Sequence, residues 1–291
     1  MRKATTAIVA CAAVLAAVLG TGSAAATPKH HPRSGGELLV LSTNGFLTRH
    51  DAGFPLLVKG KARITGVAAG DRLIGIDVRP ATGVLYSLSA GGQLYTVDAH
   101  TGQATAVGAP IALNGTAIGI DFNPTVDRIR VVTSSGQNLR LVPGTGAVAA
   151  TDTPLAYAPT DKAAGTTPAV AAAGYTNSVA GATSTLLYDL DAARDTLVTQ
   201  GTAPGVTPAV SPNTGQLFTV GRLGLRITAV NGFDIKGAAP AGPFDPSDYR
   251  AIAAVQLGGP LSVLARVDLA TGRAHVVAPL FSRAVGVAFI G

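Results

Sequence analysis

The chain has 291 residues, of which 47% are hydrophobic and 13% are charged. So apolar a composition excludes an intrinsically disordered protein. The formal net charge of +6 includes two basic residues at the extreme N-terminus, and the remaining excess of about four positive charges is spread along the chain. Such a weak and scattered charge argues against nucleic-acid binding.

The N-terminus has the pattern of an export signal. Arg2 and Lys3 precede an apolar run from Ala7 to Leu19, and small residues follow at positions 23–26. We therefore expect a signal peptide at residues 1–26 and a secreted, extracellular protein. The apolar run is shorter than the roughly 20 residues that cross a membrane as a helix, and no later segment is comparably apolar, so we expect no membrane span.

Cys11 is the single cysteine of the chain and lies inside the expected signal. Residues 8–11 loosely resemble a lipoprotein signal, an alternative that the early position of Cys11 disfavours. Cleavage of the signal would leave no thiol and no disulfide, so packing alone must stabilise the fold. We expect a disordered arm at residues 27–36 and one domain at 37–291, which we expect to be a monomer.

An internal repeat is the main indication of the fold. Residues 75–80 (GIDVRP) recur as residues 119–124 (GIDFNP), 44 positions later. Two further pairs, Gly-Gln at 92 and 136 and Thr-Gly at 101 and 145, keep the same offset. A period of about 40 to 50 residues is typical of β-propeller blades.

Each copy of the repeat divides into short β-like runs, which in the first copy are residues 74–78, 84–88, 93–98 and 104–107. Val, Ile, Leu, Tyr and Thr dominate these runs, and turns separate them. Asp98 and Gly102 flank one turn and Asp268 and Gly272 another, so each Asp can cap a turn whose Gly adopts a positive φ. We predict four-stranded blades that bury their faces by stacking.

The number of blades follows from the candidate innermost strands. Beyond the two repeats, we expect such strands at residues 171–177, 229–235 and 285–290, which makes five blades. The last one has no outer strands after it, so residues 37–42, 46–51 and 56–63 must supply them and close the ring. The predicted fold class is an all-β propeller of about five blades. Six is the alternative, because residues 212–218 resemble residues 80–86.

Five stretches of the chain have the form of family signatures, namely residues 75–80, 123–132, 136–141, 175–178 and 187–191. They resemble the signature stretches of a known family, the bacterial domain of unknown function 4394. The resemblance covers residues 37–291, nearly all of the expected mature chain, and the chain departs from the family pattern at residues 205–226. The resemblance implies a secreted, propeller-like repeat protein whose biochemical role is not established.

Asp77, Asp121 and Asp234 occupy the same place in three expected innermost strands, with Thr176 and Ala288 at the other two positions. Three carboxylates would then approach the central channel, where they could bind a divalent cation or orient a ligand. The alternative is that each accepts hydrogen bonds from the backbone of a neighbouring blade or from an arginine. No cofactor is predicted otherwise.

A second candidate site combines arginine and amide side chains from one hairpin. Side chains two residues apart in a strand share a face, which groups the arginines, and arginine binds carboxylate or phosphate in a bidentate manner. An anionic ligand would suit this group, whereas the alternative is a structural ion-pair network that uses Asp121 or Asp127. The group comprises Asn123, Asp127, Arg128, Arg130, Asn138 and Arg140.

Other motifs give little support for chemistry. Asp189, Asp191 and Asp195 only begin a calcium-loop pattern, so we expect a solvated turn there. No serine nucleophile motif, zinc motif or phosphate-binding loop is present in the sequence. The sequence therefore favours binding or scaffolding of an extracellular ligand or protein partner. The alternative is an extracellular hydrolase or lyase with its site at the channel mouth.

Overall fold

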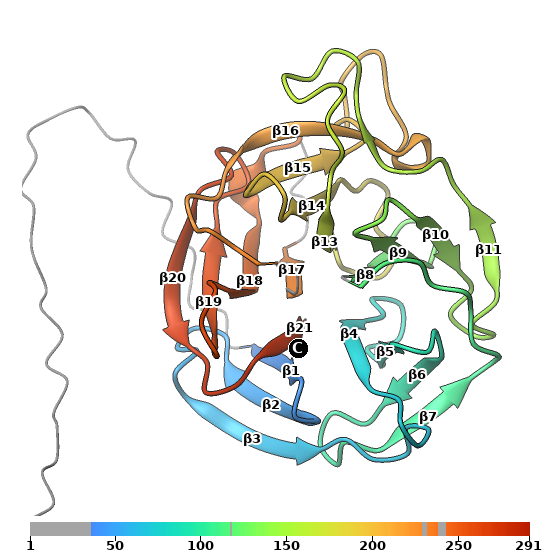
Figure 1. Ribbon diagram of the computed structural model, residues 1–291, viewed down its shortest axis with the longest axis vertical. Coiled ribbons are helices and arrows are strands. Elements are labelled where there is room, and N and C mark those ends of the chain that lie inside the picture. Colours follow the sequence, from blue (N-terminus) through green and yellow to red (C-terminus); the bar gives the residue numbers. More distant parts are fainter. Residues whose placement is uncertain (1–35, 117, 229–231, 238–242) are drawn as a thin grey trace, which may run out of the picture. The chain divides into compact units, whose positions relative to one another are not determined.

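Five β-sheets, antiparallel apart from one short parallel pair, surround a common axis in the computed structural model (Figure 1). The structure describes residues 36–116, 118–228, 232–237 and 243–291. The expected signal peptide at 1–26 and nearly all of the expected arm at 27–36 lie outside these ranges. Within them the helices are two 3₁₀ turns, Pro212–Thr214 and Pro246–Asp248, and neither has the length or the apolar character to cross a membrane.

The first blade contains the two ends of the described chain (Figure 1). From the axis outward it consists of β21 (Ala284–Ile290), β1 (Glu37–Ser42), β2 (Phe46–Asp51) and β3 (Val58–Arg63). β21 and β1 are antiparallel, with Glu37 opposite Ile290 and Leu41 opposite Gly286. This pairing confirms the predicted closure, in which the N-terminal strands complete the sheet that the C-terminal strand begins.

Three further blades are simple four-stranded meanders. The second contains β4 (Leu73–Val78), β5 (Leu85–Ser89), β6 (Leu94–Val97) and β7 (Ala104–Val107); the third β8 (Ile118–Asn123), β9 (Arg128–Thr133), β10 (Asn138–Leu141) and β11 (Val148–Thr151); the fifth β17 (Gly232–Lys236), β18 (Arg250–Gln256), β19 (Ser262–Val267) and β20 (Ala274–Pro279).

The predicted turn chemistry is present in these meanders. The carboxylate of Asp98 accepts hydrogen bonds from the backbone N–H of His100 and Thr101, each at 2.8 Å, and Gly102 follows with φ +78°. The backbone N–H groups of Ala270 and Thr271 donate to Asp268 in the same way. The same aspartate-capped turn therefore recurs in two blades.

The fourth blade is the irregular one. It contains β13 (Val170–Tyr175), β14 (Leu187–Asp191), β15 (Thr196–Gln200) and β16 (Gln216–Arg222), and the short β12 (Ala156–Tyr157) pairs in parallel with β16. Residues 212–218 lead into the outermost long strand of this blade, so the six-blade alternative is wrong. The resemblance to residues 80–86 is a shared Pro and Gly turn before a strand, which does not specify the position of that strand in a sheet.

The apolar core is divided among the interfaces between neighbouring blades. Leu88 and Phe122 lie in the cluster between the second and third blades, and Tyr188 and Phe233 lie in the cluster between the fourth and fifth. Tyr86 and Phe122 contact edge to face, with ring centroids 5.2 Å apart. Each blade thus buries both faces by stacking, as a four-stranded meander requires.

The innermost strands pass very close to one another at the axis. A Cβ atom added to Gly119 would lie 2.7 Å from Ala173 N, one at Gly232 would lie 2.5 Å from Val287 N, and one at Gly286 would lie 2.9 Å from Ile76 N. The space remaining between the strands at this level is about 10 Å³, room for one water molecule at most. The axis is therefore filled by backbone at the level of these glycines.

Gly119→Ala should consequently destabilise the protein. The new methyl group would collide with backbone atoms of β13, and overpacking of this kind costs about 1 to 3 kcal/mol. Gly144→Ala is the matched control, because a Cβ at Gly144 meets nothing within 4 Å, and its effect should stay within about 0.5 kcal/mol. Urea denaturation measures both. Equal stabilities of the two variants would show that the inner strands can separate at no cost.

Candidate functional site

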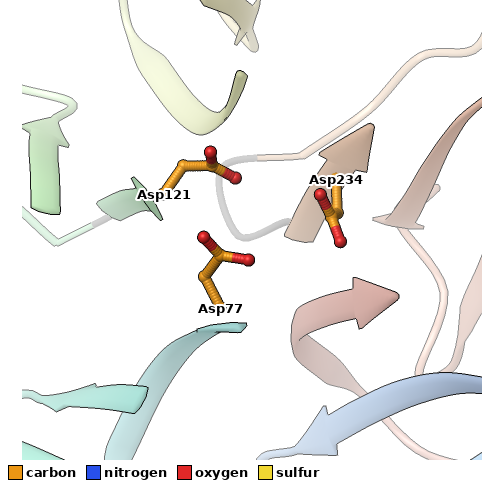
Figure 2. Close-up of side chains that lie close together, drawn as sticks. All are labelled: Asp77, Asp121 and Asp234. Atoms are coloured by element: carbon orange, nitrogen blue, oxygen red, sulfur yellow. The ribbon is translucent and has the colours of Figure 1, made fainter. Parts of the chain in front are cut away.

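Asp77, Asp121 and Asp234 converge at the axis, next to the glycine level (Figure 2). They extend from β4, β8 and β17, two residues after Gly75, Gly119 and Gly232 respectively. One carboxylate oxygen from each lies within 4.8 Å of the other two, and the three residues are 6%, 1% and 4% exposed. We call these three residues the carboxylate cluster.

Each carboxylate of the cluster accepts a hydrogen bond from the next blade. Phe122 N donates to Asp77 Oδ2 at 2.7 Å, Tyr175 N to Asp121 Oδ1 at 2.9 Å, and Phe289 N to Asp234 Oδ2 at 2.6 Å. These are the bonds expected under the structural interpretation of the repeated aspartates. They tie neighbouring blades together and satisfy buried backbone donors.

The remaining two blades lack a carboxylate at the equivalent position. In the fourth blade that position is Gly174 rather than the expected Thr176, because Gly174 lies opposite Tyr188 as Asp77 lies opposite Tyr86. In the first blade it is Ala288, two residues after Gly286, as expected. The polar residue of the Gly-x-polar pattern at 174–176 therefore lies two residues beyond this level, because Ala172 rather than Gly174 takes the place of Gly75 in the fourth blade.

The lack of a carboxylate at Gly174 and Ala288 changes the hydrogen bonds that the next blades form. No carboxylate of the preceding blade reaches Val78 N or Ile235 N, and each N–H instead donates to the residue before it, Asp77 Oδ1 at 2.7 Å and Asp234 Oδ1 at 2.5 Å. Asp77 and Asp234 therefore use both of their oxygens.

Asp121 differs because the amide that follows it, Phe122 N, already donates to Asp77. Asp121 Oδ2 is buried and has no hydrogen-bond donor. A buried carboxylate oxygen without a partner is costly unless a proton, a water molecule or a cation compensates for it.

The electrostatics of the cluster favour neutralisation. Burial, reinforced by the charge of Asp234, raises the pKa of Asp77 well above its usual range. Burial and the charges of Asp77 and Asp234 do the same to the pKa of Asp121, and burial raises the pKa of Asp234 to about 6. Three ionised carboxylates at this spacing repel one another, so the cluster must take up protons or a cation.

A cleft opens beside the cluster, at the ends of the innermost strands. Its volume is about 440 Å³, and we call it the mouth cleft. Asp77 and Asp234 line it together with basic and apolar side chains, so charges of both signs face the same space. Asp121 is not among its lining residues. Representative lining residues are Asp77, Arg79, Val179, Asp234, Lys236 and Phe289.

The second candidate site is divided by the structure into separate interactions. Arg130 is 1% exposed and lies between the third and fourth blades. Its guanidinium donates to Asn138 Oδ1 at 2.7 Å, to Asp152 Oδ2 at 2.6 Å and to Asn213 Oδ1 at 2.7 Å. Arg140 forms a bidentate pair with the same Asp152, at 2.8 Å for each bond. Asp152, absent from the sequence-based group, is thus the main carboxylate partner of both arginines.

The other members of that group lie apart from this network. Asp127 forms an ion pair with Arg79 of the preceding blade. Asn123 accepts hydrogen bonds from Thr125, and the Arg128 guanidinium donates to the carbonyl of Asp127 at 2.9 Å. The six residues therefore do not form one anion pocket, and the donors of Arg130 already have protein acceptors.

Two aspartates that were expected in a solvated turn are buried in the structure. Asp189 and Asp191 lie in β14 and are 0% exposed, so the expectation of a solvated turn is wrong for both. Tyr157 Oη donates to Asp191 at 2.5 Å, whereas neither oxygen of Asp189 has a partner. The repeat contained the signal, because residues 187–190 (LYDL) match residues 85–88 (LYSL), where Ser87 is also fully buried.

The chain belongs to the family described as Domain of unknown function (DUF4394), whose model matches residues 46–288. Among proteins of curated function, none matches this sequence.

Three solved structures share a limited likeness with the chain. BamB from Moraxella catarrhalis is 20% identical, with a TM-score of 0.34 over 82% of this chain and 57% of that one. BBS1N in complex with ARL6DN is 12% identical, with a TM-score of 0.42 over 82% and 64%. Dihydro-heme d1 dehydrogenase NirN is 13% identical, with a TM-score of 0.37 over 88% and 46%. The chain thus spans less than two thirds of each, and we draw no functional conclusion from them.

Substitution of the two arginines should separate their roles. Arg130→Ala leaves buried acceptors without a donor and should cost about 3 to 5 kcal/mol of stability. Arg140→Ala removes a side chain that is 30% exposed, and should cost about 1 kcal/mol. Thermal melts with and without phosphate test this. A stable Arg130→Ala protein that has lost a phosphate-induced shift of the wild type would instead favour an anion site.

Asp189 should make the stability depend on pH. Burial raises the pKa of Asp189 to about 8, against the opposing charge of Arg130, whereas an aspartate in an unfolded chain titrates near pH 4. Between these values the folded state binds a proton that the unfolded state does not, so the free energy of unfolding falls as the pH rises.

Asp189→Asn should therefore flatten this dependence, by up to about 1.4 kcal/mol per pH unit. Urea denaturation between pH 5 and pH 7.5 measures the slope. Asp268→Asn, at an exposed turn, is the control for loss of one charge and should retain the wild-type slope. Identical slopes in wild type and Asp189→Asn would mean that Asp189 is ionised in the folded protein.

Proposed function

We propose that this protein is a secreted binding propeller that takes a small polar ligand, or a polar group of a partner protein, in the mouth cleft. The observation that carries the proposal is the cleft itself, about 440 Å³ in volume, with Asp77 and Asp234 beside Arg79 and Lys236. Sites for small molecules are concave, largely preformed and lined by apolar surface with a few fixed polar groups.

The polar groups of the cleft are held in place by the fold. Both oxygens of Asp77 and of Asp234 accept backbone N–H groups, and Arg79 is paired with Asp127. Lys236 Nζ donates to the carbonyl of Gly291. Groups fixed in this way pay little entropy when a ligand binds, which favours recognition.

A hydrolase or lyase is the second candidate function. The observation in its favour is that two carboxyl groups with raised pKa values, Asp77 and Asp234, line the same cleft. Carboxyl groups with different pKa values can serve as general acid and general base. Binding is the better supported function, because every oxygen of these two carboxylates already accepts a backbone N–H group, which limits proton exchange with a substrate.

Secretion, a monomeric state and the lack of nucleic-acid or membrane-spanning interactions belong to this proposal as well. Secretion rests on the N-terminal sequence pattern alone. The monomeric state is supported by the closure of the ring within one chain, since β1 covers the edge of β21. An exposed rim with loops from five blades could also hold a protein partner, which is the scaffolding form of the proposal.

A melting screen with blocked variants tests the proposal. Small amines, amino acids, carboxylates and sugar phosphates are the panel, and a compound present at 100 times its Kd should stabilise the folded state by about 2.7 kcal/mol. Ala180→Trp, at an exposed residue that lines the cleft, should abolish the shift by occupying the cleft.

Ala270→Trp is the matched control, because Ala270 is equally an exposed turn residue but lies outside the cleft lining. It should leave the shift unchanged. A panel without any effect on the wild type, or shifts that survive Ala180→Trp, would contradict the proposed site. Release of product from a panel compound would favour the hydrolase or lyase.

A further inference from the structure

One buried oxygen of the carboxylate cluster accepts no hydrogen bond from the protein. Five of the six carboxylate oxygens of the cluster accept a backbone N–H group, and Asp121 Oδ2 does not. The residue is 1% exposed, and Figure 2 shows its carboxylate directed toward Asp77 and Asp234. Interblade hydrogen bonding therefore accounts for Asp121 Oδ1 but leaves Oδ2 to another partner.

We propose that the carboxylate cluster is a calcium site, with Asp121 Oδ2 as its central ligand and single oxygens of Asp77 and Asp234 beside it. The backbone N–H groups use one lone pair of each bonded oxygen, and a carboxylate oxygen has a second that can face a cation. The inference rests on the proposed function, because the cation would form the floor of the mouth cleft. Among the described residues this is the group of three acidic side chains close enough to share an ion.

The donor set selects a hard cation. All of the ligands are carboxylate oxygens, without histidine or cysteine, and such sites suit calcium, magnesium or manganese rather than zinc or copper. No ion pair in the described part of the chain neutralises a member of the cluster. A divalent cation would supply the missing positive charge and allow the carboxylates to ionise.

Calcium suits the cluster better than magnesium because its bonds to oxygen are longer. The three ligand oxygens lie within 4.8 Å of one another. Three oxygens spread evenly around one ion would lie about 4.0 to 4.5 Å apart for calcium, whereas magnesium would bring them to about 3.5 to 3.6 Å. The hydrogen bonds to the next blades hold the carboxylates in place, so the smaller ion would require the larger displacement of the inner strands.

The cluster leaves part of the coordination sphere open. Calcium takes six to eight oxygen ligands, more than the three side chains provide. Asp77 and Asp234 also line the mouth cleft, so the open positions face it. Water would fill them in the free protein, and a carboxylate or hydroxyl oxygen of a bound molecule would replace that water. The site thereby connects the cation to ligand recognition in the cleft.

Calcium binding to the full-length, EDTA-treated protein tests the inference. Isothermal titration calorimetry with CaCl₂ should show one site per chain. The melting temperature should rise with calcium concentration, by at least about 5 °C when calcium is present at 100 times its Kd. The rise with MgCl₂ should be smaller. No heat and no shift at 10 mM CaCl₂ would overturn the proposal. Tighter binding of magnesium would overturn the assignment to calcium.

Asp121→Asn is the decisive variant. Its Oδ1 can still accept the hydrogen bond from Tyr175 N, while the amide group replaces Oδ2 by a donor that repels a cation. In EDTA the variant should melt at or above the wild-type temperature, because the amide can donate to a neighbouring carboxylate, and its calcium affinity should fall by at least about tenfold. Asp98→Asn, at a capped turn outside the cluster, is the control and should bind calcium as the wild type does.

The outcomes separate this inference from the proposed function. Full calcium binding by Asp121→Asn would overturn the site. If Asp121→Asn does not fold, the wild-type stoichiometry and the calcium affinity of Asp234→Asn, which should also fall, decide instead. Panel ligands that bind the mouth cleft in EDTA, without any calcium binding, would refute the calcium site and preserve the proposed function. Calcium binding by a protein that binds no panel ligand would support the calcium site and refute the proposed function.

Discussion

The close approach of five backbones at the axis is the constraint on which the rest of this structure depends. Gly75, Gly119, Gly232 and Gly286 let neighbouring inner strands come into contact where a Cβ atom would collide with the next strand. A side chain two residues further along the same strand then faces the axis again. The glycines thus set the distance between the blades and bring the carboxylates of Asp77, Asp121 and Asp234 together.

The incomplete symmetry of the carboxylates gives the axis its chemistry. In a full ring of five aspartates, each would accept one amide from the next blade, and one oxygen of each carboxylate would remain without a backbone donor. Gly174 and Ala288 interrupt the ring, so Asp77 and Asp234 bond their own following amides and only Asp121 retains an unpartnered oxygen. Asp121 is therefore structural at one oxygen and available for binding at the other.

The interface between the third and fourth blades shows how a structural network can resemble a ligand site. Arg130, Asn138 and Asp152 are the residue types that bind small anions, yet each satisfies the others in the interior. Burial decides between the two interpretations, because an arginine with protein acceptors on every side has no donor left for a ligand. The mouth cleft is the better candidate, because it offers an open volume of about 440 Å³ beside charged residues.

The sequence alone determined what depends on local pattern: the period of 44, the turns at Asp98 and Asp268, the pairing of β21 with β1, and the shared position of the three aspartates. These features follow from repeated residues, because every blade must bury its two faces against its neighbours. The folded structure was needed to show that Gly174 rather than Thr176 stands in the ring and that Asp152 pairs with Arg130. Those facts depend on strand register and on contacts between blades, which join residues far apart in the chain and leave no periodic signal.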